Sequence, residues 1–222
     1  MNCGETALCR IRFRFVRLEQ ARDYSHVRQI KELKFRAQAS GLPYCGGKSG
    51  PRMTFGPAVS CGHTSMCEYA DLYLRESVTA GEAGEKMTAL DDGFYRLSRV
   101  SRIPVFFPAL EPSVNAARYS VKSSGPVFSE PTLRSFMALE TFPYERVKES
   151  GKRQLFDVRA CLDSAATGDG GRSLELLLNV APGASLKPET AASVIFGIPP
   201  EFESVRREEL YWKNSAGALE VF

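Results

Sequence analysis

The sequence predicts an α+β protein built from two ferredoxin-like halves, each with the element order β-α-β-β-α-β and an antiparallel sheet. Segments in which apolar and polar residues alternate, typical of strands, are separated by segments with helical periodicity. This order of elements occurs twice along the 222 residues. Between the copies, Pro104, Pro108 and Pro112 interrupt the periodicity. We therefore expect two domains, residues 1–106 and residues 107–222.

The first half opens with a strand at Cys9–Leu18, in which arginines alternate with apolar residues. A helix with Asp23 or Ser25 as its N-cap follows and ends at Gly41. Its expected apolar stripe is Val27, Ile30, Leu33 and Ala37. The other elements expected in this half are a glycine-rich loop at Cys45–Pro51, strands at Arg52–Cys61 and Cys67–Glu76, a short helix at about Gly84–Leu90 and a strand at Phe94–Ile103.

The second half repeats this order. Its helices are expected at Ser129–Leu139, with Ser129 as N-cap, and at Pro188–Phe196. Its strands are expected at Val114–Lys122, within Glu145–Ala160, and at Leu174–Val180 and Val205–Trp212, with a loop at Thr167–Gly171. Asp157 and Arg159 would share one strand face and form a local ion pair.

Charge is concentrated near the start of the chain. The net charge is only +3, yet residues 10–36 carry nine basic and three acidic residues. A local excess of this kind attracts phosphate-rich partners, although a solvated basic face without a partner explains it as well.

The cysteines and histidines offer no recognisable metal site. The six cysteines form no CxxC pair, and His26 and His63 are the two histidines. We therefore expect reduced thiols and no metal or cofactor. The absence of an apolar signal segment or of a long apolar run predicts a cytoplasmic protein that does not enter a membrane.

The first strand offers a candidate nucleic-acid contact. If Ile11, Phe13 and Phe15 fill the core, Arg10, Arg12 and Arg14 emerge on the opposite face, spaced by about 7 Å like phosphates on one strand. Tyr95 or Tyr119 would then supply a stacking surface for bases. The alternative is that these arginines pair with acidic residues of the second half and join the halves together.

The first helix and the glycine-rich loop offer a second candidate. Arg28, Lys31 and Lys34 form a stripe that is solvated surface by default. If the stripe lies beside Lys48 and Arg52 of the loop, the two would form a basic rim for a phosphate or an acidic partner. The loop lacks the spacing of a phosphate-binding loop and precedes a strand, which argues against nucleotide hydrolysis.

His26 is a weak catalytic candidate. Histidine commonly acts as a general base, but a residue at a helix N-terminus more often caps or packs, and no second acid or base is identifiable by spacing. His63, in a turn, is a weaker candidate still.

Several motifs together resemble the family of radical-SAM-linked proteins. They are Tyr24-Ser25-His26, Gly41-Leu42-Pro43-Tyr44, Gly46-Gly47, Met53-Thr54-Phe55-Gly56-Pro57-Ala58, Gly62, Ser65, Glu68-Tyr69-Ala70-Asp71, Asp157-Val158-Arg159, Gly183-Ala184-Ser185-Leu186-Lys187-Pro188-Glu189 and Arg206-Arg207-Glu208-Glu209-Leu210. The sequence departs from the family pattern where Arg28 replaces an acidic residue and Lys48 replaces an aromatic one.

The resemblance implies a place beside radical SAM proteins, because members occur next to them or fused to them, and some are joined to RNase E/G-type sequences. This chain has no C-x3-C-x2-C triplet, so any radical chemistry would take place in the partner. We expect a non-catalytic accessory protein whose partners are a radical SAM protein and RNA, either tRNA or rRNA. The alternatives are an adaptor for that partner without RNA contact, and a metal-independent endoribonuclease that uses His26.

Overall fold

The computed structural model describes residues 6–47, 49–88, 93–147, 151, 153–180 and 185–222. The chain forms two compact units, Met1–Ser113 and Val114–Phe222, in which helices and strands are mixed. The strands that pair within each unit are antiparallel. Among the described residues, no helix has the length and apolar character needed to cross a bilayer.

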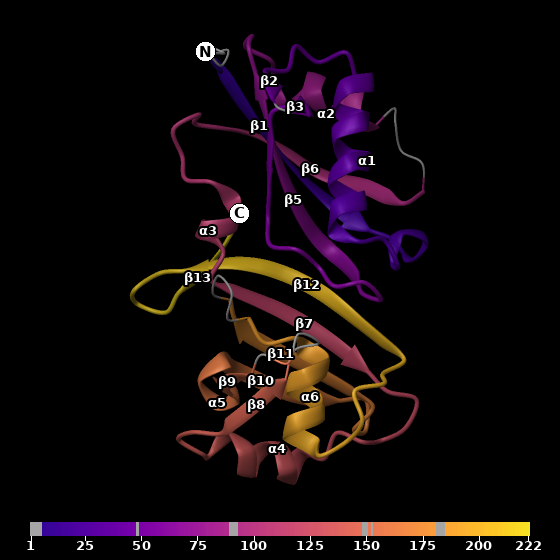
Figure 1. The fold of residues 1–222 in the computed structure, drawn as a ribbon, viewed down its shortest axis with the longest axis vertical. Helices are drawn as coiled ribbons and strands as arrows, with labels where there is room; N and C mark the ends of the chain where they lie inside the picture. Colours follow the sequence, from indigo (N-terminus) through magenta and orange to yellow (C-terminus); the bar gives the residue numbers. More distant parts are fainter. Residues whose placement is uncertain (1–5, 48, 89–92, 148–150, 152, 181–184) are drawn as a thin grey trace. The chain divides into compact units, whose positions relative to one another are not determined.

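The first unit is a sheet with two helices packed on one face (Figure 1). Its strands lie in the order β6-β1-β5-β4. The elements are β1 (Cys9–Arg17), a 3-10 turn η1 (Glu19–Ala21), α1 (His26–Ala39), the small hairpin β2 (Gly46–Gly47) and β3 (Gly50–Pro51), β4 (Met53–Phe55), β5 (Thr64–Leu74), α2 (Ala80–Thr88), β6 (Tyr95–Ile103) and α3 (Leu110–Ser113).

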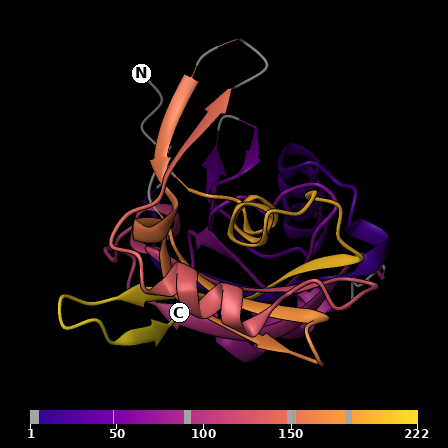
Figure 2. The same cartoon turned by 90° about the horizontal axis from the view of Figure 1, so that it is seen from below.

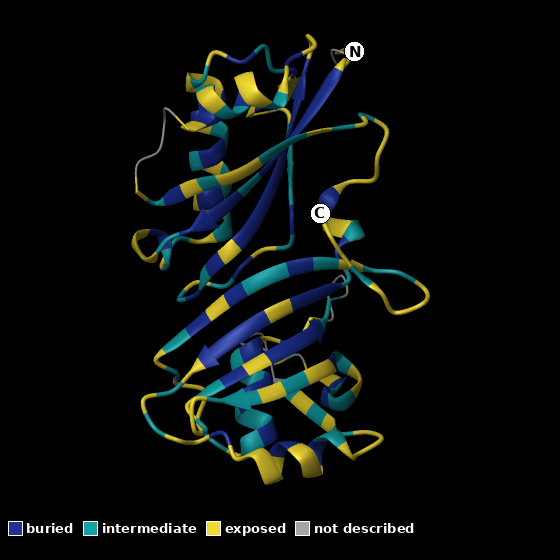
Figure 3. Cartoon of the chain, turned by 180° about the vertical axis from the view of Figure 1, so that it is seen from behind, coloured by how far each residue is buried: buried dark blue, intermediate teal, exposed yellow. Residues whose placement is uncertain are grey.

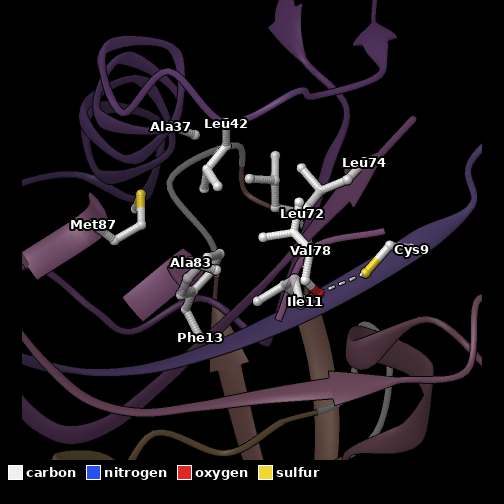
Figure 4. Close-up of a cluster of buried hydrophobic side chains, with 10 residues drawn as sticks. All are labelled: Cys9, Ile11, Phe13, Ala37, Leu42, Leu72, Leu74, Val78, Ala83 and Met87. Carbon is white, nitrogen blue, oxygen red and sulfur yellow. Dashed lines mark hydrogen bonds between the residues drawn. The ribbon is translucent and has the colours of Figure 1, made fainter. Parts of the chain in front are cut away.

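The core of this unit lies between the sheet and the two helices. Ile11 and Phe13 of β1 pack with alternate residues of β5 and with small or flexible residues of α1 and α2 (Figure 4). The full cluster is Cys9, Ile11, Phe13, Ala37, Leu42, Leu72, Leu74, Val78, Ala83 and Met87. The expected alternation in the first strand is therefore confirmed for its apolar residues, which face the helices.

A buried arginine shapes the turn that leads into α1. Arg17 is fully buried, and its guanidinium donates hydrogen bonds to the carbonyls of Ala21 (3.1 Å), Arg22 (2.8 Å) and Tyr24 (2.6 Å). These bonds satisfy the cation and hold the chain where the helix begins. Ser25 is the N-cap, because its Oγ accepts from the backbone N–H of Arg28 at 3.2 Å.

The second unit has a sheet in the order β12-β7-β11-β10, to which β13 adds beside β12. Between α4 and β10 a two-stranded hairpin, β8–β9, stands out from the sheet of its unit (Figure 2). The elements are β7 (Ala116–Lys122), α4 (Glu130–Met137), β8 (Pro143–Val147), β9 (Arg153–Asp157), α5 (Val158–Cys161), β10 (Leu162–Gly168), β11 (Ser173–Asn179), α6 (Pro188–Phe196), β12 (Ser204–Lys213) and β13 (Leu219–Val221).

Two strands differ from the sequence expectation. The strand expected at Arg52–Cys61 is reduced to β4 (Met53–Phe55), since Gly56-Pro57 follows it and proline cannot donate to a strand ladder. The edge strand β10 (Leu162–Gly168) was not expected from the sequence, which predicts a loop from Thr167. Its sequence, LDSAATG, has low β-propensity and therefore gives no strand signal. The predicted helix end at Leu90 lies outside the described residues.

Candidate nucleic-acid interface

Two of the three β1 arginines expected to contact nucleic acid are buried and bound to a carboxylate. Arg10 is 0% exposed and Arg12 is 8% exposed, and Figure 3 shows β1 buried along most of its length. Asp71 of β5 accepts from Arg10 Nε at 3.0 Å, from Arg12 Nε at 2.8 Å and from Arg12 Nη2 at 3.0 Å. The expectation of an open triple-arginine face is therefore wrong for Arg10 and Arg12.

Strand register explains this correction. In the β1–β5 ladder Arg12 lies opposite Asp71 and Arg10 lies opposite Tyr73, so one carboxylate sits between both cations. The segment after β6 closes over Arg10, whose guanidinium also donates to the carbonyls of Phe107 and Pro108. Asp71 lies in the same half of the chain as these arginines, and their pairing with acidic residues of the second half stays a prediction. Arg14 is half-buried.

Arg52 belongs to this same cluster and not to the helix stripe. Its guanidinium carbon lies 4.3 Å from the centroid of the Tyr73 ring, while that of Arg10 lies 5.2 Å from it. Arg52 is exposed to solvent, so its charge remains available on this face. The expected rim, in which Lys48 and Arg52 join the stripe of Arg28, Lys31 and Lys34, stays a prediction, because Lys48 lies outside the described residues.

The basic stripe of α1 does lie beside the glycine-rich hairpin. Lys34 Nζ is 3.0 Å from Ser49 Oγ and 3.4 Å from the Ser49 carbonyl oxygen. Helix and hairpin enclose a hollow of about 400 Å³, which we call the α1–hairpin groove. It is lined by Val27, Ile30, Lys31, Lys34, Phe35, Gln38, Ser49 and Pro51.

Apolar and basic side chains alternate on the wall of this groove. Phe35 is 68% exposed and Val27 is 61% exposed, and Lys31 lies between them on the helix and is also exposed. Arg28 is not among the residues that line the groove. Its guanidinium carbon lies 3.5 Å from the centroid of the Tyr24 ring, and its Nε lies 3.9 Å from a carboxylate oxygen of Glu32. Large exposed apolar side chains beside exposed cations are typical of a binding surface.

The exposure of Val27 corrects the expected helix stripe. The buried residues of α1 are Gln29, Leu33, Arg36 and Ala37, so the core-facing side is partly polar and Val27 lies outside it. A sequence signal for the groove existed in Phe35, a large aromatic residue that does not fit the apolar spacing of Leu33 and Ala37.

The expected aromatic platforms are not available. Tyr95 is 2% exposed and packs edge-on against Phe15, and burial raises the pKa of Tyr95 to about 12. Tyr119 is 9% exposed. The expectation that bases stack on Tyr95 or Tyr119 is therefore wrong, because both rings are buried.

The histidines lie in packed positions. His26 begins α1 and meets the Phe55 ring edge-on at 6.5 Å between centroids, and His63 is buried. Neither lines the α1–hairpin groove. Catalysis through His26 stays a prediction. In the described part of the chain, no group of three or more His, Cys, Asp or Glu side chains is placed to hold a metal ion.

Asp157 caps a short helix and does not pair with Arg159 on a strand face. Asp157 Oδ1 accepts the backbone N–H groups of Phe142 (2.9 Å), Arg159 (3.0 Å) and Ala160 (3.3 Å). The hydrogen bond from Phe142 is the main cause that lowers the pKa of Asp157. Arg159 donates to the carbonyls of Met137 and Leu162. The strand ends at Asp157, which places the two side chains in different elements.

Comparisons with known proteins give one family. Residues 10–188 match the model of a family described as an uncharacterized protein conserved in bacteria (DUF2344). No curated protein matches the chain. Among solved structures, a chain in the crystal structure of a Cbf5-Nop10-Gar1 complex is similar, with 10% identity and a TM-score of 0.48. The match covers 89% of this chain and 49% of that one, so this chain spans about half its length.

Proposed function

The chain belongs to the DUF2344 family of proteins conserved in bacteria, and from that premise we propose that it is a non-catalytic accessory protein that binds RNA and works with a radical SAM enzyme. The observation that carries the proposal is the α1–hairpin groove, where exposed Phe35 and Val27 adjoin Lys31 and Lys34. The expected RNA is tRNA or rRNA.

The groove has the chemistry that unpaired nucleotides require. An exposed aromatic ring stacks on any base and contributes about 1–3 kcal/mol per base. Lys31 and Lys34 would neutralise backbone phosphates, and each phosphate neutralised in a single strand steepens the salt dependence of binding by about 0.7 in log–log slope. Ser49 and Gln38 add polar groups that can reach base edges or ribose hydroxyls.

The radical SAM partner is proposed from the sequence resemblance. The motif Met53-Thr54-Phe55-Gly56-Pro57-Ala58 and the other motifs quoted with it are similar to radical-SAM-linked proteins. This chain lacks the cysteine triplet that would hold a radical SAM cluster, so the radical chemistry is assigned to the partner.

We also propose that each unit is ferredoxin-like. In the first unit, β1, β4, β5 and β6 are the first, second, third and fourth strands of the β-α-β-β-α-β series. They lie side by side in the order β6-β1-β5-β4, that is, fourth, first, third and second. The order β12-β7-β11-β10 does the same in the second unit when the β8–β9 hairpin is treated as an insertion. This shared order supports the proposal.

The test measures binding of the intact protein to labelled total tRNA and to labelled rRNA fragments. Fluorescence anisotropy at several salt concentrations gives the affinity. Phe35→Ala should weaken binding by about 1–3 kcal/mol, because the stacking surface for a base is removed. Lys31→Ala combined with Lys34→Ala should lower the salt slope by about 0.7 for each phosphate that is no longer neutralised.

Matched controls come from the second unit. Leu155→Ala removes another exposed apolar side chain and Lys122→Ala another exposed lysine, and both should leave binding unchanged. An affinity that does not change with salt, or equal losses of affinity in groove and control variants, would exclude RNA binding through this groove.

The adaptor alternative has support of its own in the exposed Phe106 and Phe107. An adaptor without RNA contact should purify free of nucleic acid and together with its protein partner. The ratio of absorbance at 260 nm to that at 280 nm in freshly purified protein separates the two functions.

A further inference from the structure

Within the part of the chain that the structure describes, strand β6 is an edge strand of the first unit. It pairs with β1 on one side and is the last strand in the sheet order. In an antiparallel strand, alternate residues turn their N–H and C=O groups away from the paired neighbour, so the outer side of β6 offers an open row of donors and acceptors.

Exposed cations line this edge. Arg96, Arg99 and Arg102 are all exposed. Arg102 donates to Ser77 Oγ at 3.1 Å. Within the described residues, neither Arg96 nor Arg99 has an acidic side chain in ion-pair range. The edge therefore carries a positive charge that the described part of the chain does not neutralise.

An exposed aromatic pair follows directly after β6. Phe106 is 86% exposed and Phe107 is 49% exposed, and their rings meet edge-on at 5.8 Å between centroids. The loop that carries them is held in place: the backbone N–H of Phe107 donates to the Pro104 carbonyl at 3.1 Å, and Arg10 Nη2 donates to the Pro108 carbonyl at 2.9 Å. The two rings are thus presented to solvent from a fixed backbone.

A hollow of about 320 Å³ lies at the same end of β6. It is lined by Leu8, Cys9, Arg102, Ile103, Pro104 and Val105, and Leu8 is 62% exposed. A charged edge by itself is explained as protection against aggregation. That explanation does not account for exposed phenylalanines and an apolar hollow beside the charges, because protection calls for polar residues there.

We propose that β6 and the loop at Pro104–Pro108 form a docking site for an extended acidic segment of a partner protein. The segment adds to the sheet as another strand, and its acidic side chains pair with Arg96 and Arg99. Its apolar residues fill the hollow beside Val105 and cover Phe106. A protein segment is favoured over RNA because the open strand edge supplies a row of backbone donors and acceptors that another strand matches along its length.

In the experiment, a display library of random peptides of the same length as β6 is selected for binding to the intact protein. Enriched peptides should alternate acidic and apolar residues and should protect the amides of β6 from hydrogen exchange. The double variants Arg96→Glu/Arg99→Glu and Phe106→Ser/Phe107→Ser should each weaken the selected peptides by about tenfold or more. N-methylation of alternate peptide amides should abolish binding, because it blocks strand pairing.

Controls keep this site separate from the α1–hairpin groove. Arg134→Glu on α4 and Phe35→Ala on α1 should leave peptide binding unchanged, and unchanged thermal unfolding of the β6 and loop variants excludes loss of fold. Selection that yields no binders, binders without acidic residues, or binders insensitive to the β6 variants would overturn the proposal. An oligoribonucleotide that displaces the peptides and protects the same amides would assign the edge to RNA.

Discussion

At the residue scale, Asp71 decides what the arginines of β1 do. It is fully buried and bridges Arg10 and Arg12, and the same Arg10 holds the carbonyl groups of the aromatic loop. A buried ion pair of this kind offsets its own desolvation only when every group is satisfied. A buried ion-pair cluster therefore replaces what the sequence indicated as a phosphate-binding row.

Removal of the Asp71 carboxylate should lower the stability of the folded protein. Asp71→Ala removes the carboxylate that pairs with the fully buried guanidinium group of Arg10, so we expect a decrease of about 3–5 kcal/mol in the free energy of unfolding, measured by urea denaturation. The matched control is Asp163→Ala, which breaks the exposed pair of Asp163 with Lys213 (2.9 Å) and should cost no more than about 1 kcal/mol. Similar decreases in the two variants would contradict the role assigned to Asp71.

At the element scale, Asp157 joins the β8–β9 hairpin to α5. Its carboxylate receives three backbone N–H groups, one of which comes from Phe142 just before β8. One side chain thus closes the base of the hairpin and caps the helix. An isolated two-stranded hairpin is only marginally stable in water, so this closure matters to the element as a whole.

Acid should remove this contribution. The pKa of Asp157 is lowered in the folded protein from its ordinary value of 3.8, so the folded state favours the carboxylate. The stabilisation is then complete above the ordinary pKa and is lost as pH falls through the lowered one. We expect Asp157→Ala to be less stable than the native chain at neutral pH, and the difference to shrink below about pH 4. Urea denaturation at several pH values measures it, and a constant difference down to the lowest pH would argue against the cap.

At the scale of the whole molecule, each unit has its own set of paired strands and its own buried residues. The first contains the cluster of Ile11, Phe13 and Leu72, and the second buries Leu174, Leu176 and Leu178 along β11. The division found in the structure, between Ser113 and Val114, falls just after the proline-interrupted segment of the sequence. Division of the chain into independent domains stays a prediction.

Separate expression tests that prediction. Fragments 6–113 and 114–222 should each unfold cooperatively in thermal denaturation followed by circular dichroism, because each retains a complete core. The first fragment should also keep the RNA affinity assigned to the α1–hairpin groove. A fragment that is unfolded or that aggregates on its own would show that the units depend on each other for folding.

Local patterns in the sequence determined several of the elements and their caps. The alternation in Cys9–Arg17, the N-caps Ser25 and Ser129, and the helix Pro188–Phe196 all follow from residues within one turn or one strand of each other. Such signals depend on backbone preference and on burial of one face, which neighbouring residues report directly.

Only the tertiary structure decided which of the basic residues are available. Asp71 lies far from Arg12 in sequence and becomes its partner through the register of β1 and β5. The exposure of Phe35 and Phe106 likewise depends on which surfaces the distant elements leave uncovered. Charge and hydrophobicity are properties of each residue, but long-range pairing determines whether a side chain is neutralised, buried or available to bind.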